Sequence, residues 1–137
     1  MSMFKVFDVA GSAMNAQSVR MNVTASNLAN AGQVSGDPAN VYRAKHPVFS
    51  TFSASLANQS GVSGVRLDGI VESAAPLQLR YQPNHPEANA DGNVYATNVN
   101  TVEEMVNMMS ASRSYKNNVE MINTTKDLLL QTLSLGR

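Results

Sequence analysis

Two stretches at opposite ends of the chain repeat apolar or small residues at alternating spacings of three and four. The first runs from residue 2 to about residue 30, with Gln17 and Thr24 in the intervening positions and Gly32 as a helix stop. This heptad spacing is typical of a coiled-coil seam and predicts a long N-terminal helix. The apolar or small positions of its seam are Met3, Phe7, Ala10, Met14, Met21 and Leu28.

The second stretch covers residues 102–135 and repeats the pattern, with Lys126 as the one misplaced residue. The preceding Thr101 and the later Glu104 fit a capping box, in which each side chain bonds a free backbone N–H of the first turn. At about 1.5 Å per residue each helix would run roughly 40–50 Å. The seam of this second helix holds Met105, Met108, Ser112, Tyr115, Val119, Ile122, Leu129 and Leu133.

The middle of the chain, residues 33–100, has a different texture, with all five prolines and most of the glycines. Short alternating runs at residues 65–70 and 77–81 predict strands, and Asp91-Gly92 before the next apolar run predicts a hairpin turn. The fold of residues 50–64 stays open. We therefore expect a small β-rich insert between the two helices.

Two long amphipathic segments at the two ends most simply pair as an α-helical hairpin that the middle region closes. The predicted class is α+β: residues 1–32 and 101–137 form an inner coiled-coil domain around the insert at 33–100. Pairing would bury both seams, at about 25 cal/mol per Å² of apolar area removed from water.

The outer face of the N-terminal helix lacks the charges that a solvated helix face carries. Between Phe7 and Leu28 the only charged residues are Asp8 and Arg20. Small uncharged residues cost little to desolvate, so this face predicts contact with other subunits. Packing of the same face against the chain's own middle region is the alternative.

The composition of the chain excludes several classes of partner and of location. Ten basic and ten acidic residues give zero net charge, which argues against nucleic acid or an anionic membrane surface as partner. There is no cysteine and no apolar run long enough for a membrane span. Polar residues interrupt any signal-peptide core, and on these grounds alone the chain would be assigned to the cytoplasm.

No catalytic or metal-binding constellation stands out. His46 and His85 each precede a proline and lack a second ligand at helical spacing, so we expect loop histidines. The adjacent Glu103 and Glu104 are explained by the helix dipole. Asp91 lacks the ligand spacing of a calcium loop. We therefore predict no enzyme activity and no cofactor.

Three segments carry a resemblance to a known family: "FDVAGSAMNAQSVRMNVTASNLANA", "YRAKHPVF" and "PNHPEANADGNVYATNVNTVEEMVNMMSASRSYKNNVEMINTTKDLLLQTLSLGR". Together they cover nearly the whole chain, and they closely resemble the flagellar rod and hook (axial) proteins, and among these the proximal-rod subunits of the basal body. The element "SNLANA" alone would indicate only the wider axial group.

This resemblance implies a structural subunit of a tubular, torque-transmitting shaft around a central export channel. It implies export by the flagellar type III apparatus without a cleaved signal, and a working position in the periplasmic span of the basal body. The implied partners are copies of the chain, other rod proteins, the adaptor to the membrane ring and distal rod subunits.

The resemblance also marks candidate assembly residues. Ser26, Asn27, Leu28, Ala29 and Asn30 would form a helix-to-loop junction that packs against neighbouring subunits, with the two asparagines bonding backbone groups where the helix ends. Residues 110–115, which include Arg113, would form a second contact region. The full interface set adds Phe7, Met14, Met21, Met105, Met108, Ser112, Tyr115, Val119, Ile122, Leu129 and Leu133.

Two rival functions remain: a cytoplasmic coiled-coil adaptor or export chaperone, and a secreted cell-wall hydrolase. The first needs a face charged enough for solubility, and the second needs a carboxylate or metal site. If the subunit reading holds, the terminal segments of the free subunit should be largely disordered and should order on assembly.

Overall fold

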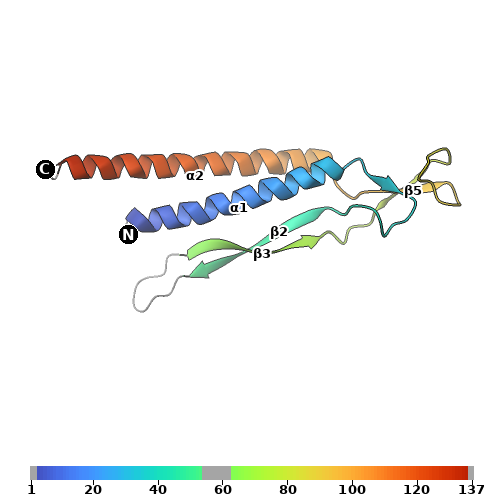
Figure 1. Ribbon diagram of the computed structural model, residues 1–137, viewed down its shortest axis with the longest axis horizontal. Helices are drawn as coiled ribbons and strands as arrows, with labels where there is room; N and C mark the ends of the chain where they lie inside the picture. Colours follow the sequence, from blue (N-terminus) through green and yellow to red (C-terminus); the bar gives the residue numbers. More distant parts are fainter. Residues whose placement is uncertain (1–2, 54–62, 136–137) are drawn as a thin grey trace.

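The computed structural model describes residues 3–53 and 63–135 of the chain, which has the predicted α+β class (Figure 1). Part of the stretch 50–64, whose fold the sequence left open, belongs to strands, and residues 54–62 lie outside the described residues. In chain order the elements are α1 Met3–Asn30, β1 Val34–Ser35, β2 Lys45–Ser53, β3 Ser63–Glu72, β4 Gln78–Tyr81, β5 Asn93–Ala96 and α2 Thr101–Leu135.

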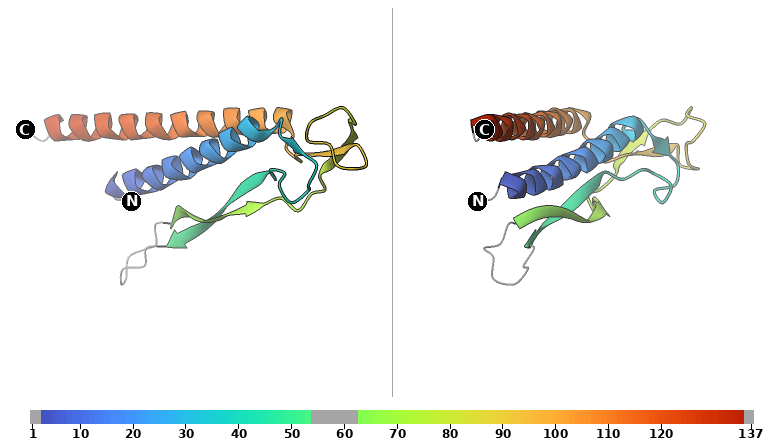
Figure 2. Two further views of the ribbon diagram at one scale, coloured as in Figure 1. Left: turned by 45° about the vertical axis from the view of Figure 1, so that its right-hand side comes forward. Right: turned by 60° about the vertical axis from the view of Figure 1, so that its left-hand side comes forward.

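The two predicted helices form with nearly the predicted bounds and run antiparallel (Figure 1). They lie side by side where α1 ends and α2 begins, and they separate toward Met3 (Figure 2). The helix α2 also continues past the start of α1. The pair is therefore a hairpin that opens at one end. The predicted coiled coil does not extend along the whole length of the two helices in the single chain.

The start of α2 is capped by Asn100, so the predicted capping box is wrong. Asn100 Oδ1 accepts hydrogen bonds from the backbone N–H of Val102 at 3.1 Å and of Glu103 at 3.4 Å. Asparagine is among the best N-cap residues because its side-chain oxygen reaches these free donors. Glu104 does not reach back to the cap, because its side chain is buried against α1.

The strands β2 and β3 form a two-stranded antiparallel ribbon with a register shift between Val48 and Phe49. The ribbon lies along α1 on the side away from α2, so α1 is held between a helix and a ribbon (Figures 1 and 2). The strand predicted near residues 65–70 is confirmed as part of β3. The strand β2 was not predicted, and it places His46 opposite Val71 in a strand rather than in a loop.

A second sheet, with strand order β1-β5-β4, lies beyond the helix junction (Figure 1). The β4–β5 hairpin predicted around Asp91-Gly92 is confirmed, but its connection spans residues 82–92 rather than a two-residue turn. Gly92 has a φ of 75°, and a Cβ added there would lie 3.1 Å from Pro83 Cβ. The positive φ therefore favours glycine at this position, and an added Cβ would also be crowded.

The core of the chain is thin. Its largest fully buried side chains are Val94 and Asn27, and most of its other buried apolar residues are alanines. Many large apolar side chains are exposed instead, including Met109 at 62% and Leu133 at 68%. Because soluble monomers bury most such side chains, this surface predicts further contacts outside the chain.

Candidate assembly interface

The predicted seam of α1 points inward. Ala10 and Thr24 are buried, and Gln17 is half-buried like the predicted interface residues of this seam. Large and small residues alternate along it, so α1 can approach its neighbours closely. The half-buried interface residues are Phe7, Met14, Met21 and Leu28.

One part of the uncharged face of α1 is packed against the chain itself, and the rest is exposed to solvent. One part packs against the β2–β3 ribbon, where Ser12 Oγ accepts a hydrogen bond from the Val65 backbone N–H at 3.2 Å. The alternative of packing on the middle region therefore holds for this part. The rest is exposed and carries one charged residue, Asp8; its other members are Val9, Asn15, Asn22, Ala25, Ser26 and Ala29.

The seam of α2 that faces α1 differs from the predicted one at alternate positions. Ala111 is completely buried and Glu104 is 4% exposed, whereas Met105 is 55% exposed. Thr125 replaces Lys126 as the half-buried residue, which explains why Lys126 fits the predicted seam badly. The buried and half-buried residues at this spacing, here called the α1-facing seam, are Glu104, Met108, Ala111, Tyr115, Asn118, Ile122, Thr125 and Leu129.

Asn27 is the best-connected side chain of the junction between the helices. Its Nδ2 donates to Glu104 Oε2 at 3.0 Å and to the Lys45 carbonyl at 2.9 Å. Its Oδ1 accepts from the Lys45 N–H and from the Tyr42 hydroxyl, both at 2.9 Å. All four bonds of the amide are satisfied, so one residue fastens α1 to α2, to β2 and to the loop before it.

This position corrects the interface expectation for Asn27. The residue is 1% exposed, so its side chain is enclosed by its own chain. The expected bond to backbone near the helix end is present, through Lys45. Around it, Ser26 Oγ lies 3.2 Å from the Tyr42 hydroxyl, and Asn30 Nδ2 donates to the Ser26 carbonyl at 2.8 Å. Leu28 is half-buried and Ala29 is exposed.

Sequence reasoning missed the partners of Asn27. Tyr42 and Lys45 lie in the loop and strand that follow, with the Lys45 ammonium 5.4 Å from the centre of the Tyr42 ring. Glu104 was interpreted as a helix cap. A buried glutamate one turn into a helix is recognisable only when the facing helix offers a donor, and no spacing rule places Asn27 opposite it.

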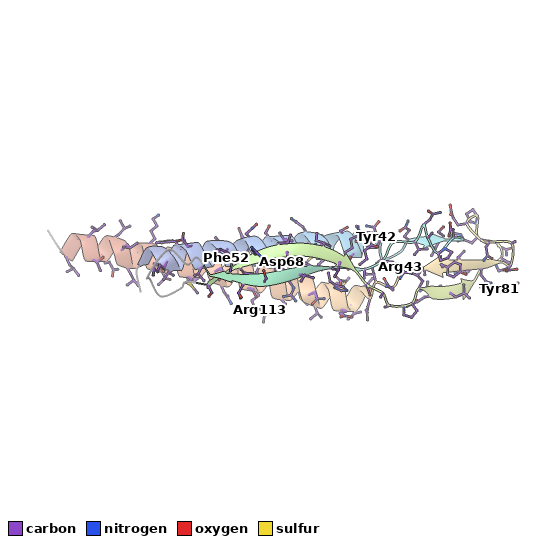
Figure 3. All side chains as sticks on the ribbon, turned by 90° about the horizontal axis from the view of Figure 1, so that it is seen from below. Tyr42, Arg43, Phe52, Asp68, Tyr81 and Arg113 are labelled. Carbon is purple, nitrogen blue, oxygen red and sulfur yellow. The ribbon has the colours of Figure 1, made fainter. Side chains whose placement is uncertain are left out.

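The outer surface of α2 carries an open groove of about 710 Å³ in its first half. Four of its lining residues belong to the predicted interface set. Figure 3 shows Arg113 extending outward from α2. The lining residues are Met105, Met108, Met109, Ser112, Arg113 and Lys116.

A smaller hollow of about 380 Å³ lies between α1, the ribbon and the start of α2. Arg20, which donates to Asn107 Oδ1 at 3.2 Å, lines it together with Lys45, His46 and Glu104. Within residues 3–53 and 63–135, no three acidic or histidine side chains are grouped so as to hold a metal ion. Neither helix, within the described residues, contains an apolar run that would span a bilayer.

Comparison with known proteins gives consistent matches at both ends of the chain. Residues 7–36 match the family described as "Flagella basal body rod protein", and residues 90–135 match "Flagellar basal body rod FlgEFG protein C-terminal". The flagellar basal-body rod protein FlgC of Escherichia coli O6:H1 is 50% identical over the full length of both chains. The FlgC proteins of Salmonella typhimurium LT2 and of Buchnera aphidicola from Acyrthosiphon pisum are 49% and 42% identical over at least 99% of both chains.

Proposed function

The chain belongs to the FlgC family of flagellar basal-body rod proteins, and we propose that it builds a tubular, torque-transmitting shaft with a central export channel. It is a structural subunit of the basal-body rod. The finer position, in the periplasmic span of the proximal rod, is part of the proposal. So is delivery by the flagellar type III export apparatus without a cleaved signal.

The observation that carries the proposal is the thin core beside the many large apolar side chains that α2 leaves exposed. A free-standing globular protein of this size would bury its methionines and leucines. Here Met105, Met109 and Leu133 are more than half exposed. A subunit that is enclosed on assembly has a physical reason to leave these side chains outside, because its neighbours remove them from water.

We propose that the exposed members of the interface set contact neighbouring subunits directly. These are Met105, Arg113 and Leu133 on α2 and Ser26 and Ala29 on α1. In the assembly, helices of neighbouring subunits would occupy the space between α1 and α2 where these two helices separate. This packing would extend the coiled coil beyond the single chain. Asn27 would act indirectly, by fixing the angle at which α1 and α2 leave their junction.

We propose that the three regions of the chain take different positions in the rod. Residues 1–32 and 101–137 would form the inner domain, and residues 33–100 would face outward. The partners would be copies of the chain, other rod proteins, the adaptor that joins the rod to the membrane ring, and distal rod subunits. The proposed role requires no catalysis and no cofactor.

Electron microscopy of the purified chain mixed with other purified rod proteins tests the proposal. We expect tubular co-assemblies that contain the chain, and none when the chain is left out. A cytoplasmic adaptor or chaperone would give small discrete complexes with its clients instead. Discrete complexes without tubes, together with normal rods in a strain that lacks the chain, would contradict the rod function.

A further inference from the structure

The first turns of α2 carry an exposed apolar face. Val102, Met105, Val106 and Met109 follow the spacing i, i+3, i+4, i+7, so their side chains share one side of the helix. Their exposed fractions are 69%, 55%, 55% and 62%. We call these four residues the methionine patch. Met105 and Met109 also line the groove of about 710 Å³ on the outer surface of α2.

Methionine is the residue type of this chain that peroxides attack most readily. The sequence contains eight methionines, no cysteine and no tryptophan. Cysteine is the usual competitor for such oxidants, and here it is absent. The side chains of Met105 and Met109 are more than half exposed in the folded chain. The expected disorder of the terminal segments in the free subunit would expose them further, so an oxidant reaches them before assembly in either state.

We propose that Met105 and Met109 form an oxidation-sensitive site, at which conversion to the sulfoxide excludes a free subunit from the rod. The proposal rests on the proposed function, in which assembly removes these side chains from water. The oxidant is a hydroperoxide. The methionine sulfur attacks its terminal oxygen, so that an S–O bond forms while the O–O bond breaks. The departing oxygen takes up the proton of the transferred one and leaves as water or an alcohol. The sulfur is thereby oxidised by two electrons and the peroxide is reduced.

Oxidation makes the patch polar without changing its charge. A thioether is apolar and adaptable, whereas a sulfoxide carries an oxygen that accepts hydrogen bonds from water. The neighbouring side chains of Val102 and Val106 have no group to donate in place of water. Arg113 follows Met109 by one turn of the helix but follows Met105 by two, so it is too far along the axis to serve Met105. Burial of the oxidised patch therefore costs free energy that burial of the thioethers does not.

Met121 provides a matched control in the same helix. Its side chain is 48% exposed, and it belongs neither to the groove nor to the predicted interface set. Asn117 and Thr124, which are exposed and lie one turn before and after it, have polar groups that can donate to a sulfoxide oxygen. Oxidation at Met121 should therefore leave incorporation into the rod unchanged.

Competition between oxidised and unoxidised chains tests the proposal with the natural sequence. The full chain is treated briefly with hydrogen peroxide, so that most oxidised molecules carry a single sulfoxide, and is then mixed with other purified rod proteins. Sedimentation separates tubes from unassembled chain, and site-resolved mass spectrometry measures the sulfoxide in each fraction. Sulfoxide at Met105 and Met109 should be about tenfold rarer in the tubes than in the unassembled chain, whereas sulfoxide at Met121 should be equally frequent in both.

The possible failures have different signatures. Equal sulfoxide contents of the two fractions at Met105 and Met109 would overturn the proposal. Equally strong exclusion of sulfoxide at Met121 would also overturn it, because the effect would then not belong to the patch. Absence of tubes from the untreated chain would instead contradict the rod function itself, and the proposal would fall with it.

Reduction and substitution identify the responsible atoms. Methionine sulfoxide reductases that act on the two sulfoxide epimers should restore co-assembly of the oxidised chain, and failure to restore it would assign the loss to other damage and overturn the proposal. The double variant Met105→Leu, Met109→Leu, compared with its own untreated sample, should lose far less co-assembly on peroxide treatment than the natural chain does. Met121→Leu should lose as much as the natural chain. An undiminished loss in the double variant would place the sensitive site elsewhere.

Discussion

The side-chain amide of Asn27 donates a hydrogen bond to Glu104 Oε2 across 3.0 Å, joining the last turn of α1 to the first turn of α2. Both side chains are buried. A hydrogen bond to a carboxylate is stronger than one between neutral groups, and exclusion of water strengthens it further. In a core made mostly of alanine and valine, this contact fixes where the two helices meet.

Removing the amide should therefore destabilise the chain strongly. Asn27→Ala loses four hydrogen bonds and leaves the Glu104 carboxylate buried without its donor, so we expect a loss of about 3–5 kcal/mol in the free energy of unfolding. Urea unfolding followed by circular dichroism measures it. Asn30→Ala, which removes only the bond to the Ser26 carbonyl, is the matched control and should cost under about 1 kcal/mol. Equal losses would contradict the junction role.

The cap of α2 can be located by a pair of substitutions. Asn100→Ala removes the acceptor for the first-turn N–H groups and should cost about 1 kcal/mol. Thr101→Ala should change stability by less than about 0.5 kcal/mol, because Thr101 is exposed and does not cap the helix. Thermal unfolding measures the loss of stability in each variant. A larger loss for Thr101→Ala than for Asn100→Ala would instead support the capping box predicted from sequence.

If this seam faces α1, the cost in stability of a large side chain should differ strongly between neighbouring positions of α2. Ala111 is completely buried between the helices, so Ala111→Leu should force them apart and cost about 1–3 kcal/mol. Ser110→Leu adds similar bulk at an exposed position and should be nearly neutral. Comparable urea midpoints for the two variants would show that the seam lies elsewhere.

Hydrogen exchange should reveal a gradient along α1 in the dilute subunit. The C-terminal half holds buried Val23, Thr24 and Asn27 near the helix junction, whereas residues 5–14 lie where the helices separate and include one buried residue, Ala10. Amides of residues 5–14 should therefore exchange much faster than those of residues 20–28. Uniform strong protection from residue 5 to residue 28 would contradict both this gradient and the expected disorder of the free termini.

Exposed positions on α2 should matter for the rod and not for the fold. Met105→Lys changes a side chain that is 55% exposed, so the free energy of unfolding should shift by less than about 0.5 kcal/mol. Motility on soft agar should nevertheless fall, because assembly would bury the new charge. Asn117→Lys adds the same charge at an exposed polar position of α2 and should leave motility near normal. Full motility of the Met105 variant would count against this surface.

The helices were predictable from sequence because heptad spacing and the glycine after the first helix are local signals. The seam of α2 was predictable only in part, since the positions buried against α1 include Glu104, Ala111 and Thr125 while neighbouring methionines stay exposed. Hydrophobicity therefore points to these exposed methionines as strongly as to the seam. Only the facing residues of α1 decide between them.

The strand β2 escaped prediction for a different reason. Its sequence contains Pro47, which normally argues against a central strand. A two-stranded ribbon has an outer edge on each strand, so the proline is tolerated, and packing on α1 stabilises the ribbon. That packing is a long-range contact, and the local sequence carries no sign of it.

Because α1 and α2 separate toward the start of α1, the helix pair is wedge-shaped, narrow at the junction and wide at the other end. Identical tapered bodies set side by side turn through the same angle at every step, so the spread between the two helices would set the circumference of any tube they form. A bulky side chain placed in that opening would then change the number of subunits per turn before it changed whether they associate.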